Sequence, residues 1–215
     1  MKCPHPSSLL PSILLSLACA SGAASATSYT IDASHTQVFV TYDHNGYSHL
    51  SARFNQVTGT FDFDPANPAK SSIQVSLPIS SLSTGVPRLD MHIAGVDMLD
   101  AAQFPSATFK SSKVTVLGKN HLSVGGELTI HGVTRPVVFE VHVNSTAPHP
   151  MRKMPAAGFD ARAKIKRSDF GVSFMLPGVA DEVALSISME AGVRKDPPAA
   201  PPAPPAAPAS GTSKG

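Results

Sequence analysis

The sequence predicts an all-β protein, an extended antiparallel barrel of about eight strands with one or two short helices near residues 87–102. Three observations support this fold class. Several segments alternate apolar and polar residues, short turn-forming segments separate them, and only one stretch has apolar residues at helical spacing. An up-and-down series of this size removes its exposed edges by closing. The barrel then encloses either packed side chains or one small ligand.

Residues 1–26 have the pattern of a cleaved signal peptide. Lys2 is the only charged residue before Asp32, an apolar run covers residues 9–20, and residues 24–26 are the small residues that a signal peptidase accepts. That run is shorter than the roughly 20 residues needed to span a bilayer. We therefore expect cleavage near Ala26 and a periplasmic or secreted mature protein.

Both cysteines, Cys3 and Cys19, lie within this segment. Cleavage after it leaves no thiol, which excludes disulfides, cysteine metal sites and thiol nucleophiles. One alternative is a bacterial lipoprotein acylated at Cys19, although Ser16 stands where such sites usually have an aliphatic residue. Acylation at Cys19 would place the protein on a membrane surface.

The mature chain is nearly neutral, because removing Lys2 lowers the formal net charge from +2 to +1. With no basic cluster and no tryptophan, it has no footprint for nucleic acid. Residues 196–215 contain no apolar side chain larger than proline and alanine, which predicts a disordered tail serving as a spacer, a partner motif or a plain linker. Residues 27–195 remain and suit one domain.

The strand predictions follow from period-two alternation. Residues 37–44 and 73–79 both alternate, and residues 159–166 do so most clearly. In that last segment Phe159 and Ile165 share an apolar face, while the opposite face carries charged side chains. One face must therefore be buried and the other solvated. Turn-forming residues at 64–68, 118–120 and 131–135 separate such runs as hairpin connections.

The helical stretch lies between Pro87 and Gln103. Pro87 suits a first helical turn, Asp97 suits the N-cap of a second piece, and Pro105 prevents continuation, so two short helical pieces are expected. The apolar residues of this stretch would either cover the end of a ligand or plug the barrel as core; they are Leu89, Ile93, Met98, Leu99 and Phe104.

Five motifs together resemble the YceI-like lipid-binding family: YTIDASHTQVFVTYDHNGYSHLSARFNQVTGTFDFDP, SLSTGVPRLDMHI, AAQFPSATFKS, LTIHGVTRPV and GFDARAKIKRSDFG. The resemblance covers residues 28–191 in order. It implies an exported bacterial protein with a lipocalin-like barrel that holds a polyisoprenoid or another long-chain lipid. Ile93 and residues 97–99 depart from the family's usual leucine and aromatic pair, which implies a differently shaped pocket.

The nine histidines also raise the possibility of a metal site or an acid–base pair. Asp43 and His44 are adjacent, so a strand places them on opposite faces, and His49 lies beyond a turn. We therefore expect no metal, no cofactor and no catalytic residue. His44 should point into the barrel, where it either makes a structural hydrogen bond or contacts a ligand head group. Asp90 and His92 would cap or brace the helix.

The sequence thus predicts an exported carrier or sequestering protein for a long apolar lipid, such as an isoprenoid quinone, a polyprenyl phosphate or a fatty-acyl lipid. A hydrolase or isomerase of such a lipid and an envelope protein with a filled barrel are the alternatives, and a homodimer is left open. The side chains expected to contact the lipid are Val38, Val40, Tyr42, His44, Leu50, Phe54, Phe61, Leu89, His92, Ile93, Met98, Leu99, Phe104, Phe109, Ile165 and Phe170.

Overall fold

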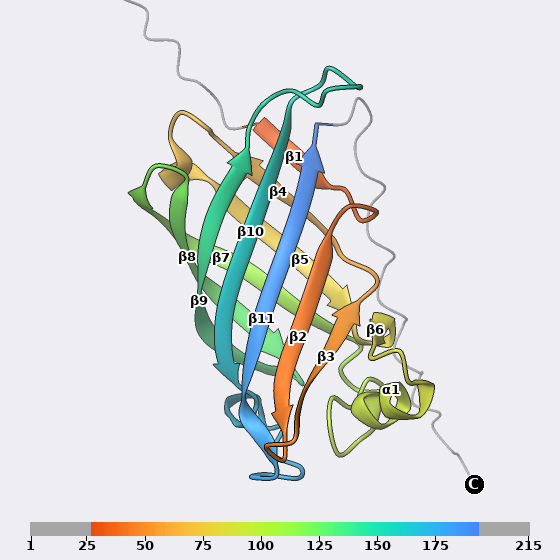
Figure 1. The fold of residues 1–215 in the computed structure, drawn as a ribbon. Helices are drawn as coiled ribbons and strands as arrows, with labels where there is room; N and C mark the ends of the chain where they lie inside the picture. The colour runs from red at the N-terminus through yellow and green to blue at the C-terminus, as the bar shows by residue number, and fades with distance from the viewer. Residues whose placement is uncertain (1–26, 194–215) are drawn as a thin grey trace, which may run out of the picture.

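The computed structural model describes residues 27–193, which form eleven strands and one α-helix (Figure 1). The expected signal peptide at 1–26, with both cysteines, and the expected tail at 196–215 lie outside the described residues. The strands are β1 (Thr27–Ile31), β2 (Gln37–His44), β3 (Ser48–Phe54), β4 (Thr58–Phe63), β5 (Ser72–Pro78), β6 (Leu82–Ser83), β7 (Ser106–Gly118), β8 (His121–Ile130), β9 (Val133–Ser145), β10 (Ala156–Lys166) and β11 (Val179–Gly192).

Three strands of the barrel are each interrupted once, which is why eight long strands are divided into eleven. β1 and β2 both pair with β11, β4 pairs with β1, and β3 pairs with β2. β5 and β6 continue the series beside β4 and β3. Each long strand therefore pairs with the next, and β11 closes the sheet by pairing back to β1 and β2. All these pairings are antiparallel, so the predicted eight-stranded barrel is confirmed.

Alternation along the strands separates an apolar interior from a charged exterior. In β10 the side chain of Phe159 is buried and that of Ile165 is half-buried, whereas Asp160, Lys164 and Lys166 are exposed. The same period of two recurs in β7, β8 and β9. The interior of the barrel is therefore lined by apolar residues from every long strand.

The helical stretch forms one α-helix, α1 (Pro87–Ala94), rather than two pieces. The chain then reverses direction: the Leu99 N–H donates to Ile93 O and the Ala101 N–H to Ala94 O. These backbone groups bond back to the end of α1, so residues 96–103 form turns and Asp97 caps no second helix. Three short 3-10 helices complete the fold, η1 (Pro68–Lys70), η2 (Ile79–Ser81) and η3 (Arg167–Phe170). Between residues 27 and 193 no helix has the length and apolar character needed to cross a bilayer.

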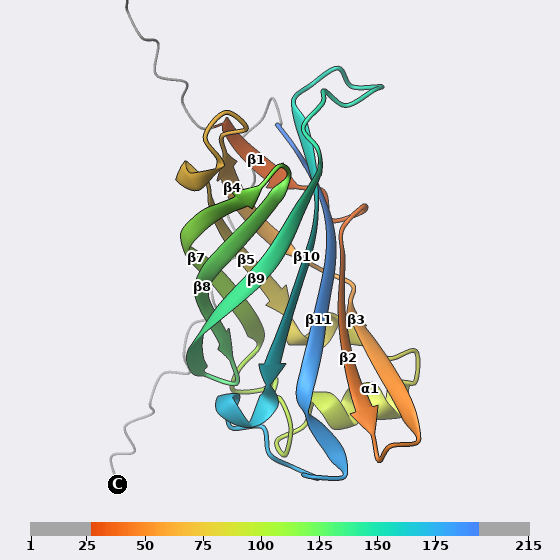
Figure 2. The same ribbon diagram turned by 60° about the vertical axis from the view of Figure 1, so that its left-hand side comes forward.

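The two ends of the barrel are built from different segments. At one end, here called the α1 end, α1 lies beside the β2–β3 turn and the segment that joins β10 to β11 (Figure 2). At the other end lie the β4–β5, β7–β8 and β9–β10 connections (Figure 1). Four aromatic rings pack together in the strands there, and we call it the aromatic end. The interior of the barrel lies between these two ends.

Candidate functional site

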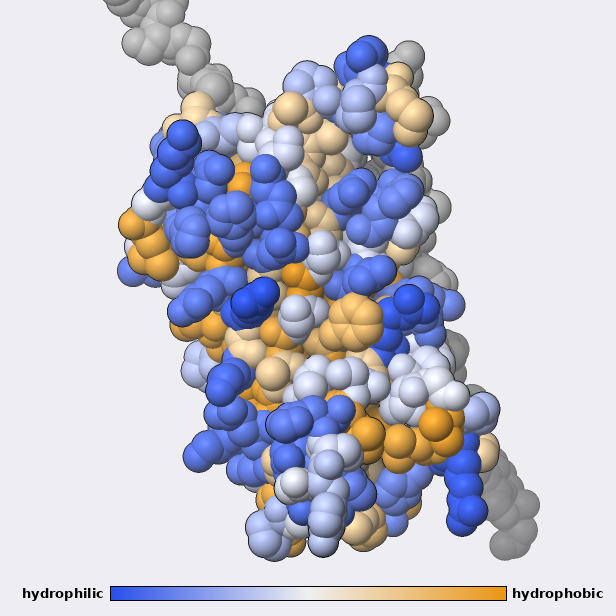
Figure 3. Space-filling view, viewed as in Figure 1, coloured by the Kyte–Doolittle hydropathy of each residue, from blue (hydrophilic) through white to orange (hydrophobic). Residues whose placement is uncertain are grey.

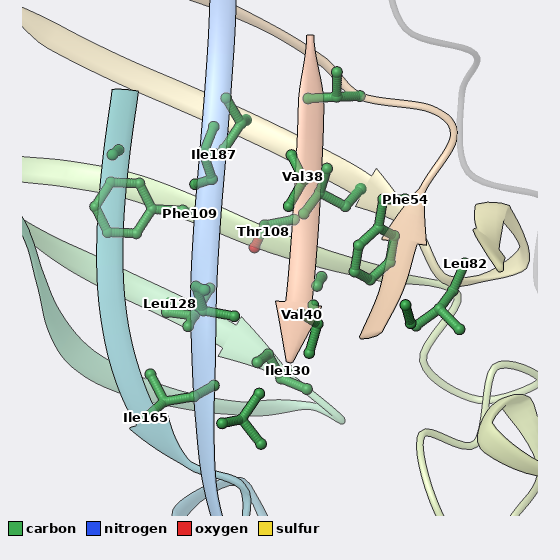
Figure 4. A pocket seen from close by; sticks show the side chains of 18 of the residues that line it. Val38, Val40, Phe54, Leu82, Thr108, Phe109, Leu128, Ile130, Ile165 and Ile187 are labelled. Atoms are coloured by element: carbon green, nitrogen blue, oxygen red, sulfur yellow. The ribbon is translucent and has the colours of Figure 1, made fainter. Parts of the chain in front are cut away.

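The barrel encloses an apolar cavity of about 400 Å³. This volume falls within the range of about 300–1,000 Å³ typical of ligand pockets. Figure 4 shows Val38, Val40, Ile165 and Ile187 pointing into the same space from three strands. Several of these side chains remain partly exposed in the middle of their strands, because the interior is not filled by neighbouring side chains.

The aromatic end closes the cavity. Tyr29, Phe61, Phe63 and Phe159 pack ring against ring, with centroids 5.1–6.3 Å apart. Each of the four residues is only 3–6% exposed. Three of them, Phe61, Phe63 and Phe159, line the cavity, so this cluster forms its floor. Edge-to-face contacts of this kind add to the free energy gained from burying the rings.

At the α1 end the cavity meets solvent. Phe174 and Met175 line the cavity and are nevertheless 41% and 53% exposed. Leu89, His92 and Ile93 of α1 lie across the same opening. The rings of His92 and Phe174 contact each other edge to face, with centroids 5.7 Å apart. α1 and the β10–β11 segment thus border the same opening, the mouth of the cavity.

A carboxylate braces the start of α1. Asp90 accepts hydrogen bonds from the Thr84 N–H and Thr84 Oγ1, both at 2.6 Å, and from Ser83 Oγ at 3.2 Å. These bonds favour the charged carboxylate, Thr84 Oγ1 most of all, and lower the pKa of Asp90. Of the two roles considered for Asp90, the structure therefore supports bracing: the carboxylate attaches the helix to the segment after β6.

Arg167 is the one charged side chain that is both buried and in the cavity lining among the described residues. Its guanidinium donates to the carbonyl oxygens of Val172, Phe174, Val179 and Ala180 at 2.8–3.0 Å. Burial lowers the pKa of Arg167, although the neighbouring Asp181 and Tyr42 oppose that shift. Burial also raises the pKa of the Tyr42 hydroxyl. The α1 end of the cavity therefore carries a fixed positive charge that also holds the β10–β11 segment in place.

Arg167 is not among the residues that the sequence predicts in the cavity, although the alternation along β10 indicates its position. The inward residues of β10 are odd-numbered, from Phe159 to Ile165, and Arg167 is the next odd position. A charged residue continuing an apolar face has either to leave the strand or to find buried partners. It does the latter through η3 and the following loop.

The other polar candidates form no catalytic constellation. His44 lines the cavity, and its ring nitrogens contact only the Asn45 side chain, at 3.3 and 3.4 Å. His49 lies 3.9 Å from Asp43, with 79% of its side chain exposed. Within residues 27–193 no three metal-ligating side chains come together.

Fifteen of the sixteen residues expected to contact the lipid line the cavity, and Phe104 does not. The Phe104 ring instead packs on His131, with centroids 4.7 Å apart, and on Gly132, where a Cβ would come within 2.5 Å of it. Because the chain turns back after α1, this side chain reaches the β8–β9 turn outside the cavity. Lining residues absent from the expectation include Ile73, Val75, Leu77, Val124, Leu128, Ile130, Phe139, Leu185 and Ile187.

A YceI-like domain model matches residues 29–191. The protein YceI of Escherichia coli O157:H7 is 37% identical over 190 residues, which cover 87% of this chain and 98% of that protein. The crystal structure of BcnA from Burkholderia cenocepacia matches with a TM-score of 0.68 and 29% identity, over 74% of this chain and 98% of that one. A polyisoprenoid binding domain from Saccharophagus degradans shares the fold, with a TM-score of 0.57 and 14% identity over 77% and 98% of the two chains.

Proposed function

The chain belongs to the YceI-like family, and we propose that it is an exported carrier or sequestering protein that holds one long apolar lipid inside its barrel. One observation carries the proposal: an unfilled apolar cavity runs from an aromatic floor to a mouth beside α1. The signal-like pattern of residues 1–26 supports export to the periplasm or beyond. The polyisoprenoid binding of the Saccharophagus degradans domain, which shares this fold, supports a lipid ligand.

The energetics favour a long chain over a small polar ligand. Burying one CH₂ contributes roughly 0.8 kcal/mol, so a buried five-carbon prenyl unit contributes about 3–4 kcal/mol. Association costs about 4–15 kcal/mol, and micromolar binding needs a net of about 8 kcal/mol. Several prenyl units, or an acyl chain of similar length, are sufficient without a strong polar contact. A quinone, a polyprenyl phosphate and a fatty-acyl lipid all fit this requirement.

Binding is a better proposal than catalysis. A base acting on the lipid would need a partner that orients it and a second group within reach of the reacting atom. His44 contacts only Asn45, and His92 contacts the apolar ring of Phe174. A structural protein with a filled barrel is also disfavoured, because the interior holds an open cavity.

The test is native mass spectrometry of protein purified from its own host, followed by lipid extraction. We expect the wild-type protein to carry a long-chain lipid and the Ala161→Phe variant to carry much less, because Ala161 lines the cavity and a ring there fills it. Arg162→Phe is the matched control, since it adds the same ring on the outer face one residue away. Equal lipid in a folded Ala161→Phe variant and in wild type would place the ligand outside the barrel.

A further inference from the structure

Large apolar side chains are exposed mainly at the α1 end. Six of the ten exposed large hydrophobic residues among the described residues lie there: Tyr47, Val86, Met91, Val96, Phe174 and Met175, between 41% and 92% exposed. We call these six the apolar rim. Figure 3 shows apolar side chains gathered in the region of α1, at the lower right of the view. The aromatic end exposes Val116, Leu117 and Met151, and the remaining residue, Val138, lies on β9.

The rim comes from three segments that are attached to one another. Tyr47 lies in the β2–β3 turn, where the neighbouring Asn45 N–H donates to Gly178 O at 2.8 Å. Phe174 and Met175 lie in the β10–β11 segment, which touches α1 through the contact of Phe174 with His92. The rim residues therefore lie on three connected segments at the end where the cavity opens, and two of them, Phe174 and Met175, line its mouth.

From this arrangement we infer that the apolar rim docks on the surface of a phospholipid bilayer, with the cavity mouth facing the lipid. This rests on the proposed lipid-carrier function. Phe174 and Met175 belong to both rim and cavity lining, so the apolar surface continues without a break from outside to inside. A lipid that moved from the cavity into water would expose more apolar surface at each step. When the rim is docked on a bilayer, the lipid moves along apolar surface instead. The interior of a bilayer consists of hydrocarbon chains, as the proposed ligand does, so a bilayer is the partner that this surface fits.

Charges near the rim indicate how it docks. The stretch from α1 to the following turn carries Arg88 together with Asp90 and the exposed Asp97, and the β2–β3 hairpin carries Asp43 beside His49. Since charges of both signs are interspersed, no basic patch is available to attract anionic head groups. Docking is apolar insertion, and it depends only weakly on salt and on anionic lipid.

The test measures flotation of the full-length mature protein with phosphatidylcholine vesicles, with and without phosphatidylglycerol. Met91→Asp combined with Val96→Asp should weaken vesicle binding by about tenfold or more, because both side chains leave water on insertion. Neither residue lines the cavity. The matched control is Leu117→Asp with Met151→Asp. These side chains are 63% and 84% exposed at the aromatic end, against 70% and 71% for Met91 and Val96, and the control should bind vesicles as wild type does.

The affinity for a dispersed fluorescent fatty acid, measured without vesicles, separates this inference from the proposed function. The rim variant should keep that affinity and bind vesicles weakly. If the wild-type protein does not bind the fatty acid, that result counts against the proposed binding of long apolar chains in the cavity, whatever the vesicles show. The docking inference is overturned if wild type does not float, if the rim variant floats as well as wild type, or if flotation requires phosphatidylglycerol at low salt. A wild-type dimer that dissociates in the rim variant, without flotation, would assign the rim to a second copy of the chain.

Discussion

The two ends of the barrel are closed in different ways. At the aromatic end four rings are 3–6% exposed and contact one another directly. At the α1 end Ile93, Phe170 and Val172 are buried, but six large apolar side chains are 41–92% exposed, against three at the aromatic end. The segments there are held by hydrogen bonds that Arg167 donates and Asp90 accepts. Regions with few buried apolar contacts open at low free energy, while densely packed regions open only on global unfolding. The aromatic end therefore supplies stability, and the α1 end supplies access.

The largest expected effect is the difference in stability between removing a ring at the aromatic end and removing one at the α1 end. Phe159→Ala at the aromatic end should lower the free energy of unfolding by about 3–5 kcal/mol, because a buried ring is replaced by a cavity. Phe174→Ala at the α1 end should lower it by less than about 1 kcal/mol, since that ring is already 41% exposed. Urea unfolding of both variants measures the difference. Equal losses would contradict the assignment of stability to the aromatic end.

The same contrast explains which parts of the structure the sequence predicted. Period-two alternation predicted the strands and the inner face, because one face of each strand must be buried whatever its neighbours are. Closure of eight long strands followed from their up-and-down order. The three interruptions, such as the one at residues 55–57, could not be predicted. The alternation of residues does not show where a long strand breaks its pairing with its neighbours.

Predictions were poorer at the α1 end, where backbone geometry rather than periodicity determines which way side chains point. Asp97 has the residue type of an N-cap, but the backbone bonds back to α1 and no second helix forms. Phe104 follows that reversal and points to His131 instead of into the cavity. Arg167 was missed because its partners are backbone carbonyls, which leave no sequence motif.

A substitution with an intermediate effect should show whether α1 covers the bound ligand, as a lid, or fills the end of the barrel as core, as a plug. Ile93 on α1 is 7% exposed and lines the cavity. We expect Ile93→Asp to weaken lipid binding by about tenfold or more, about 1.4 kcal/mol, while most of the melting temperature survives, because the core of the barrel lies elsewhere. His92→Ala should affect lipid affinity less. Thermal melting and lipid titration of both variants measure this. Collapse of the fold in Ile93→Asp would make α1 a plug, and full affinity in a folded Ile93→Asp protein would refute the lid.

The smallest expected effect is a local dependence on pH at the start of α1. Hydrogen bonds from Thr84 and Ser83 lower the pKa of Asp90 below the ordinary value of about 3.9 for an aspartate. A carboxyl whose pKa is lower in the folded state stabilises that state fully above its unfolded pKa, and this contribution is lost as the pH falls through the folded pKa. Acidification below about pH 4 should therefore loosen the attachment of α1 while the ring contacts of the aromatic end persist.

Amide hydrogen exchange at Thr84, whose N–H donates to Asp90, measures this loosening directly. Exchange at Thr84, corrected for its intrinsic pH dependence, should accelerate on acidification in wild type. It should already be fast at neutral pH in Asp90→Asn, because a neutral amide is a weaker acceptor than a carboxylate. Amides of β10 beside Phe159 serve as the internal control and should keep their protection in both proteins. If Thr84 and the β10 amides lost protection together, the two ends would be one cooperative unit, and access could not open without unfolding the barrel.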